Sequence, residues 1–421
     1  MDQAISKTTL DNGIRILTKK MPYARSISMG VWVNVGARDE LPSENGLSHM
    51  IEHMIFKGTQ KRTAFQIAKE FDAIGGQTNA FTSFEYTCYH ARVIDAHLET
   101  MVDILSDIFL NSIFDEKEVE KERPVIFQEI NMVEDNPEEY VHILSGNTYW
   151  GDNPLGRSIL GTRENVIGFN ASIIKDFFHR FYQPEHIVIS AAGNISHQHF
   201  VDLVSPVFKS SRQGNGLAER ITPACHSQVR MHYRDLEQVH ICLGTRGISI
   251  TNPKRYAFSL LNTILGGNMS SRLFQKIRER RGLAYSVYSY ISSYVDTGIF
   301  GAYVAVQPEN ALKAAELIIK EMKALKNDRV DKTELKDAKD YTIGNLLLAS
   351  ESIDSQMVRL AQNEINFGHD IALETVVDHI NAVSDEDIIT IAESLFQGDQ
   401  LGMTTLGALK DENAFMEILG S

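Results

Sequence analysis

Hydrophobic residues recur along this chain with two periods, and each period predicts one kind of element. A period of two, or a short apolar run between turn residues, predicts strands. Strands are expected after the Asn12-Gly13 turn up to residue 20 and at 27–35, 77–91, 187–193, 228–234, 239–245, 284–292 and 298–306. Apolar residues three and four apart predict helices at 46–58, 63–73, 97–111, 173–181, 197–208, 255–265 and 310–325, within 114–137 and from 331 onward. This mixture favours an α+β fold with largely antiparallel sheets.

The second half of the chain repeats the order of elements found in the first half. Between the halves, residues 209–226 are rich in serine, glycine and asparagine, which is typical of a linker. We therefore expect two duplicated α/β-sandwich domains, at 1–208 and 227–421, joined by this linker. The length of 421 residues is sufficient for a large core in each domain.

The helix expected at 46–58 carries the most informative polar residues. It is expected to begin at Asn45 and Gly46 and to stop at Gly58. One side of it is apolar, with Leu47, Met50, Ile51, Met54 and Ile55.

His49 and His53 lie four residues apart on this helix, so their imidazoles leave the same face, and Glu52 lies beside them. Two such imidazoles can bind one zinc ion at about 2.0–2.1 Å, and a neighbouring carboxylate can take a proton from water. The order His-x-x-Glu-His is the inverzincin signature. The alternative is a solvated helix face, but three unpaired polar groups in so apolar a helix would be costly.

A catalytic zinc ion needs a third protein ligand and an open position. The best source is the charged stretch 114–137, which begins 61 residues after His53 and contains several glutamates. Glu122 and Glu129 are seven residues apart and share a helix face. The pattern alone leaves four candidates open: Glu118, Glu122, Glu129 and Glu134.

These motifs resemble the pitrilysin and mitochondrial-processing-peptidase family of zinc metallopeptidases. Members combine His-x-x-Glu-His with a glutamate some 75 residues later in a Glu-Arg…Glu helix, although the spacer is one residue shorter here. The resemblance implies that His49, His53 and Glu129 bind one zinc ion per chain. It further implies that Glu52 is the general base and that Glu122 is the second catalytic carboxylate, which supports the ligands rather than binding zinc.

The resemblance also implies residues that contact substrate. Asn79 and Ala80 match a strand edge that pairs with an extended substrate backbone. Arg278 and Tyr285 match an arginine and a tyrosine that hold a substrate carbonyl. Without the resemblance, the first stretch would be interpreted as a simple hairpin and the second as a solvated basic helix.

The second half lacks the ligand set. Aligning Gly267 with Gly58 places Phe258, Leu261 and Asn262 opposite His49, Glu52 and His53. One copy of each motif per chain, together with the resemblance, implies a homodimer that closes a chamber around peptide or unfolded polypeptide substrates.

Composition limits the remaining possibilities. A net charge of −14 argues against nucleic-acid binding. No apolar run approaches 18 residues and no signal peptide is evident, so we expect no membrane span. Three cysteines without a Cys-x-x-Cys pair fit a reducing compartment, so a cytoplasmic enzyme, or one whose presequence has been removed, is expected.

The resulting hypothesis is a zinc-dependent endopeptidase. One alternative is a catalytically inactive or regulatory subunit of a heteromeric peptidase, although such subunits usually lose the ligands. Another is a metal-binding module without hydrolytic activity, which would more often close its site with four ligands. Manganese or cobalt could occupy the same three ligands.

Overall fold

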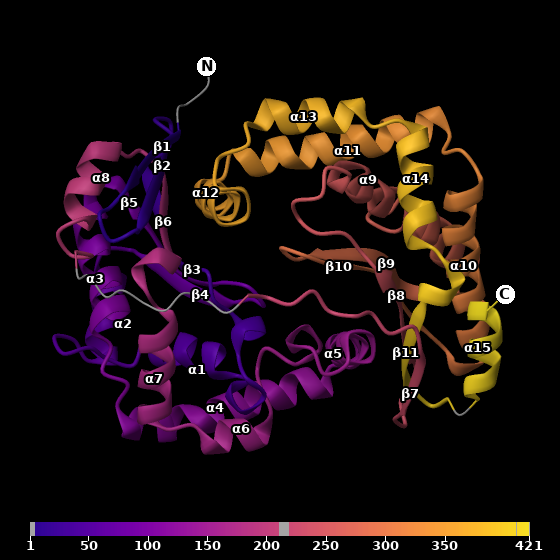
Figure 1. Ribbon diagram of the computed structural model, residues 1–421, viewed down its shortest axis with the longest axis horizontal. Coiled ribbons are helices and arrows are strands. Elements are labelled where there is room, and N and C mark those ends of the chain that lie inside the picture. The colour runs from indigo at the N-terminus through magenta and orange to yellow at the C-terminus, as the bar shows by residue number, and fades with distance from the viewer. Residues whose placement is uncertain (1–4, 210–218, 410, 421) are drawn as a thin grey trace. The chain divides into compact units, whose positions relative to one another are not determined.

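The computed structural model describes residues 5–209, 219–409 and 411–420. Half of the predicted linker at 209–226, residues 210–218, therefore lies outside the described residues. The chain forms two compact units (Figure 1): the first comprises residues 1–130, 158–220 and 347–370, and the second comprises residues 131–157, 221–346 and 371–421.

The first unit is built on a six-stranded sheet. Its strands run in the order β1 (Ile5–Thr9), β2 (Arg15–Lys20), β6 (Ile187–Gly193), β3 (Ser26–Val33), β5 (Thr87–Ile94) and β4 (Gln77–Thr82). β2 and β6 are parallel, and the other neighbouring strands are antiparallel. β4 is therefore an edge strand.

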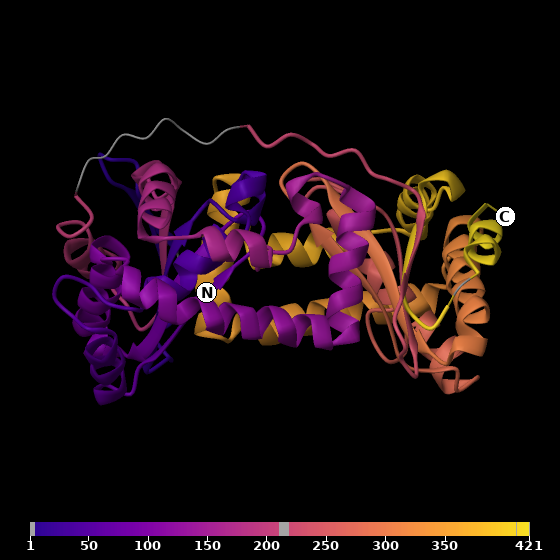
Figure 2. The same ribbon diagram turned by 90° about the horizontal axis from the view of Figure 1, so that it is seen from below.

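Helices of the first half pack on this sheet around one large apolar core. They are α1 (Leu47–Met54), α2 (Ala64–Ala73), α3 (Leu98–Asn111), α6 (Arg163–Gly168), α7 (Ala171–Phe181) and α8 (His197–Val204). The long helix α4 (Glu116–Asp135) belongs to this unit as far as Ile130. Figure 2 shows the helices from a second direction.

A helix from the second half completes the first unit. α12 (Ile353–Phe367) packs against β2, β3 and β6 (Figure 1). Its Met357 and Leu360 are buried in a cluster with Trp32 and Cys88. At the rim, the buried carboxylate of Glu364 accepts a hydrogen bond of 2.7 Å from Lys7.

The second unit contains a five-stranded sheet in the order β7 (Val229–Tyr233), β11 (Gly402–Gly407), β8 (Val239–Arg246), β10 (Gly298–Val306) and β9 (Ala284–Ser293). Its helices are α5 (Pro137–Trp150), α9 (Arg255–Leu265), α10 (Ala311–Asn327), α11 (Lys332–Ser350), α13 (Leu373–Ala382), α14 (Asp385–Leu395) and α15 (Glu412–Gly420), with a π-helical segment at Phe274–Glu279. α11 belongs to this unit as far as Leu346.

The two sheets repeat one topology. If the strands of each half are numbered along the chain from β2 and from β7, both sheets have the spatial order first, fifth, second, fourth, third. In both sheets the first and fifth strands are parallel. The predicted α+β fold with duplicated, largely antiparallel sheets is confirmed.

The predicted domain boundaries differ from the compact units. The prediction cut the chain once, at 209–226, whereas the chain passes between the units within α4, within α11 and after residues 157, 220 and 370. Each half thus gives one helix to the other unit, because α5 buries Val141 on the second sheet and α12 buries Met357 on the first.

In the part of the chain that the structure describes, none of the helices is both long enough and apolar enough to cross a membrane.

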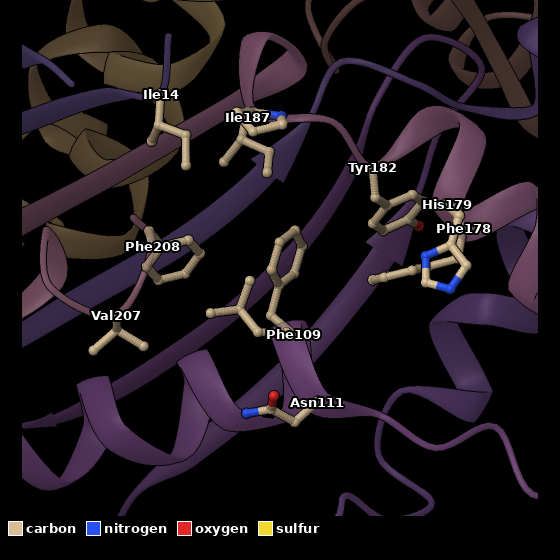
Figure 3. A pocket seen from close by; sticks show the side chains of 11 residues that line it. Ile14, Phe109, Asn111, Phe178, His179, Tyr182, Ile187, Val207 and Phe208 are labelled. Atoms are coloured by element: carbon tan, nitrogen blue, oxygen red, sulfur yellow. The ribbon is translucent and has the colours of Figure 1, made fainter. Parts of the chain in front are cut away.

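An apolar pocket of about 310 Å³ lies in the first unit (Figure 3). Phe109 and Asn111 of α3, Phe178 of α7 and Tyr182 contribute to its lining. The residues singled out above as candidate ligands or substrate contacts do not line it.

Because Met357 is 1 % exposed and fills the first unit's cluster around Trp32, Met357→Ala is expected to destabilise that unit by about 2–5 kcal/mol. The free energy of unfolding can be followed by Trp32 emission in a Trp150→Phe background. Leu348→Ala is the matched control, since Leu348 is 70 % exposed, and it should change stability little. Equal effects of the two substitutions would contradict the packing role of α12.

Candidate metal centre

The helix that carries His49 and His53 is held at its N-terminus by a buried carboxylate. α1 begins after Gly46, whose φ of +103° suits glycine, and a Cβ there would come within 2.9 Å of the Gly161 backbone. The carboxylate of Glu40 accepts hydrogen bonds from the backbone N–H of Gly46 at 2.8 Å and of Ser48 at 2.7 Å. Burial raises the pKa of Glu40 to about 7, although these backbone donors oppose the shift.

The predicted helix start is confirmed, because Gly46 is the N-cap of α1. The Asn45 side chain does not cap the helix, because its amide donates to Glu40 at 3.2 Å and to the Ser158 carbonyl at 2.9 Å. The helix ends earlier than predicted, at Met54. Gly58 lies beyond it with a φ of +131°.

Three ligand atoms meet above the polar face of α1. His49 Nε2 and His53 Nε2 are 3.3 Å apart, and each lies 3.4 Å from Glu129 Oε2. In the described residues, these three side chains form the one group with metal-binding spacing. A tetrahedral zinc ion with ligands at about 2.0–2.1 Å separates its ligand atoms by about 3.3–3.4 Å. The donor set and its spacing therefore fit zinc, and three protein ligands leave a fourth position open.

The charges at this group favour a cation. Burial lowers the pKa of His53, but the hydrogen bonds and negative charges of Glu122 and Glu129 outweigh burial and raise that pKa to about 9. Hydrogen bonds from His49 and His53 hold the pKa of Glu129 well below its usual range. Without a metal ion, the site therefore holds a proton on His53 that a cation would have to displace.

Glu122, the other glutamate of the predicted pair, contacts the Nδ1 side of the His53 ring. Glu122 Oε1 is 2.9 Å from His53 Nδ1, and Glu122 Oε2 is 2.6 Å from Lys57 Nζ. Burial alone would raise the pKa of Glu122, but the hydrogen bonds from His53 and Lys57 lower it. Of the four glutamates left open by the pattern, Glu129 lies near Nε2 of both histidines, and Glu122 lies near Nδ1 of His53. Glu118 instead pairs with Lys121 at 2.6 Å.

Glu52 is tied to the edge strand of the first sheet. Its Oε2 accepts a hydrogen bond of 2.5 Å from the hydroxyl of Thr82, the last residue of β4. Asn79 and Ala80 lie earlier on the same strand, where they pair with His90 and Tyr89 of β5. Asn79 is exposed, and the other side of β4 has no strand partner in the sheet.

Arg278 and Tyr285 lie together in the second unit. The guanidinium of Arg278, on the π-helical segment, is 4.4 Å from the Tyr285 ring centroid and 4.7 Å from that of Phe274. Tyr285 is 79 % exposed at the start of β9, so its ring is accessible. π-Helical turns often occur at functional sites.

Three residues that shape this site have no role predicted from the sequence: Glu40, Lys57 and Thr82. Lys57 and Thr82 belong to the stretches 46–58 and 77–91, in which other residues were predicted to act. Glu40 carries no local signal, because it lies six residues before the glycine whose N–H it binds.

Among the described residues of the second half, no equivalent ligand set is found. α9 occupies the place in the second sheet's topology that α1 occupies in the first. Phe258 and Leu261 on α9 are buried in the core of the second unit.

We expect the zinc affinity of the metal-free protein to rise with pH, because His53 must lose a proton before Nε2 can bind a cation. With a pKa of about 9 for His53, the apparent affinity should increase about tenfold per pH unit between pH 6 and 8 and level off above about pH 9. Competition with a chromogenic chelator across this range measures it. An affinity that does not change with pH would contradict a protonated His53.

Comparisons with known proteins give one consistent family. The model of the insulinase family, peptidase family M16, matches residues 15–163, and the model of the M16 inactive domain matches residues 168–341. The chain is 41 % identical over 397 residues to the uncharacterized zinc protease YmxG of Bacillus subtilis, covering 94 % of this chain and 96 % of that protein. It is 38 % identical over 418 residues to an uncharacterized zinc protease of Streptomyces coelicolor, covering 97 % and 91 %.

Two solved structures share the fold. A protease from Helicobacter pylori superimposes with a TM-score of 0.88 at 22 % identity, over 96 % of this chain and 99 % of that chain. A structure described as a peptidase M16 inactive domain, from Pseudomonas fluorescens, gives a TM-score of 0.89 at 18 % identity, over 97 % and 99 %.

Proposed function

We propose that this chain, which belongs to peptidase family M16, is a zinc-dependent endopeptidase that cleaves peptides and unfolded polypeptide segments. The observation that carries the proposal is the triangle of His49, His53 and Glu129, whose ligand atoms are 3.3–3.4 Å apart. A structural zinc site would more often be closed by a fourth protein ligand.

A zinc ion held by these three residues would polarise the scissile carbonyl and lower the pKa of water. Glu52 takes the proton from the attacking water and delivers it to the leaving amine. The Thr82 hydroxyl occupies Glu52 Oε2, which leaves Oε1 for the proton. Glu122 supports the ligand set from behind His53.

The substrate lies as an added strand along the outer edge of β4, beside Asn79 and Ala80. The position of β4 at the sheet edge supports this role, because an edge strand offers unpaired backbone N–H and C=O groups. Such binding recognises extended backbone, so flexible or unfolded chains are the expected substrates. The proposed role of Arg278 and Tyr285 is to hold the substrate carbonyl.

Glu52→Gln is expected to lower kcat by ~10²–10⁴-fold, because the amide cannot act as a general base. Turnover of a quenched fluorogenic peptide of about ten residues measures the loss, and zinc content should stay at one ion per chain. Glu118→Gln is the matched control, since this glutamate on α4 contacts Lys121 rather than the histidines. Thr82→Val should lower kcat less than Glu52→Gln does. Full activity of a zinc-loaded Glu52→Gln protein would exclude the mechanism.

The proposal includes a homodimer in which Arg278 and Tyr285 of one subunit act at the metal centre of the other. Mixing Glu52→Gln protein with Arg278→Ala protein should then restore activity, because a mixed dimer contains one site with both residues intact. Each variant mixed with itself serves as the control. If the mixture stays at the activity of the separate variants, sharing between subunits is wrong.

A further inference from the structure

Lys57 lies next to the candidate metal centre and has no part in the proposed reaction. Its Nζ lies 2.6 Å from Glu122 Oε2, while Glu122 Oε1 lies 2.9 Å from His53 Nδ1. One carboxylate thus joins a lysine to a histidine, with one oxygen for each. The Glu122 side chain is 7 % exposed and the Lys57 side chain 30 % exposed.

His49, His53 and Lys57 lie at equal spacing, although Lys57 lies beyond the end of α1. Lys57 follows His53 by four residues, as His53 follows His49, and the chain continues after α1 in a tightened turn in which Lys57 N–H donates to the Met54 carbonyl at 3.1 Å. On α4, Glu122 and Glu129 are two turns apart. Glu129 faces His49 and His53, and Glu122 faces His53 and Lys57.

The contact between Glu122 and His53 determines which imidazole nitrogen is available. A hydrogen bond from Nδ1–H to a carboxylate leaves the lone pair on Nε2, where a metal ion would bind. Among the described residues, the buried Nδ1 of His49 has no hydrogen-bond partner. The contact that orients a histidine through its Nδ1 atom is therefore the one between His53 and Glu122.

Glu122 needs Lys57 to keep this orientation. A buried carboxylate with one unpaired oxygen is unfavourable and would turn to satisfy it. Lys57 binds that oxygen, so the other oxygen stays directed at His53.

Lys57 is also placed more firmly than a surface lysine. Gly58, which follows it, has a φ of +131°, and the Gly58 carbonyl accepts a hydrogen bond of 3.2 Å from Ile113 N–H. Exposed ion pairs between mobile side chains contribute little, but here the backbone of the lysine is anchored and its partner is buried.

We propose that Lys57 is a positioning residue of the metal centre, which holds Glu122 and through it the tautomer and ring orientation of His53. This inference rests on the proposed function, because it assumes that the triangle of His49, His53 and Glu129 binds zinc. Lys57 touches neither the metal position nor the substrate, so its effect should appear first in metal affinity.

The test compares zinc dissociation constants, measured with a competing chromogenic chelator, for wild type, Lys57→Met and Lys57→Arg. Losing the outer partner of a metal ligand, which is Glu122 here, typically weakens metal binding 10–100-fold. Because Lys57 holds Glu122 in place, Lys57→Met should raise the dissociation constant at least about tenfold. Lys57→Arg keeps the cation and should stay within about threefold of wild type. The absorption spectrum of the cobalt-loaded protein should shift in Lys57→Met and not in Lys57→Arg.

Lys7→Met is the matched control. Lys7 is 38 % exposed and pairs at 2.7 Å with Glu364, which is 2 % exposed, in the same unit. This pair resembles that of Lys57 but contacts no candidate ligand, so the zinc dissociation constant should not change. In a Glu122→Gln background, Lys57→Met should change the constant less than about twofold, because Lys57 acts through Glu122.

The outcomes separate the two proposals. If wild-type protein binds no zinc at the triangle, the proposed function fails. If wild type binds zinc and Lys57→Met binds it with unchanged affinity and an unchanged cobalt spectrum, the inference about Lys57 is wrong while the proposed function stands. A loss of thermal stability equal to that of Lys7→Met, without a change in affinity, would likewise overturn it.

Discussion

The candidate metal centre depends on how a very short helix is held in place. α1 has eight residues, and an isolated helix of that length is unstable in water. Its geometry is therefore imposed by contacts at both ends and along one side. Glu40 binds the N-terminal N–H groups, Leu47, Met50, Ile51 and Met54 are buried in the core, and the Ser112 hydroxyl donates to the Ile55 carbonyl at 2.8 Å. Because these contacts fix the helix, the imidazoles keep one spacing.

α4 supplies the opposite charge to this fixed face. Two of its carboxylates, Glu122 and Glu129, lie two turns apart and contact His49 and His53 of α1. At the same centre, the Thr82 hydroxyl connects Glu52 to the edge strand β4. In the proposed reaction, the strand that pairs with substrate is thus also the strand that orients the general base.

The two halves of the chain share one sheet topology but differ in one helix. The two sheets have the same strand order, yet the helix after the second strand of each copy differs. In the first copy it carries His49, Glu52 and His53, and in the second it buries Phe258 and Leu261. The exchange of α5 and α12 between the units makes each half depend on the other for its packing, since α12 covers Trp32.

The sequence by itself determined most of the local structure and the donor types of the site. The strand predicted at 298–306 and the helix predicted at 255–265 coincide with β10 and α9. β10 is a short apolar run whose residues are all buried, and the apolar residues of α9 recur at helical spacing. The spacing of His49 and His53 likewise follows from the helical repeat. Pattern could not choose among Glu118, Glu122, Glu129 and Glu134, since all lie on one charged helix. Only the resemblance to the family implied that Glu129 is the third ligand.

Tertiary structure decided the rest. In the folded chain, Glu129 of α4 faces the Nε2 atoms of His49 and His53, and Glu122 faces Nδ1 of His53. The partnership of Glu40 with α1 and the burial of Met357 on the first sheet join residues that share no local pattern. Such contacts depend on which surfaces meet in three dimensions, and the linear order of the residues does not carry that information.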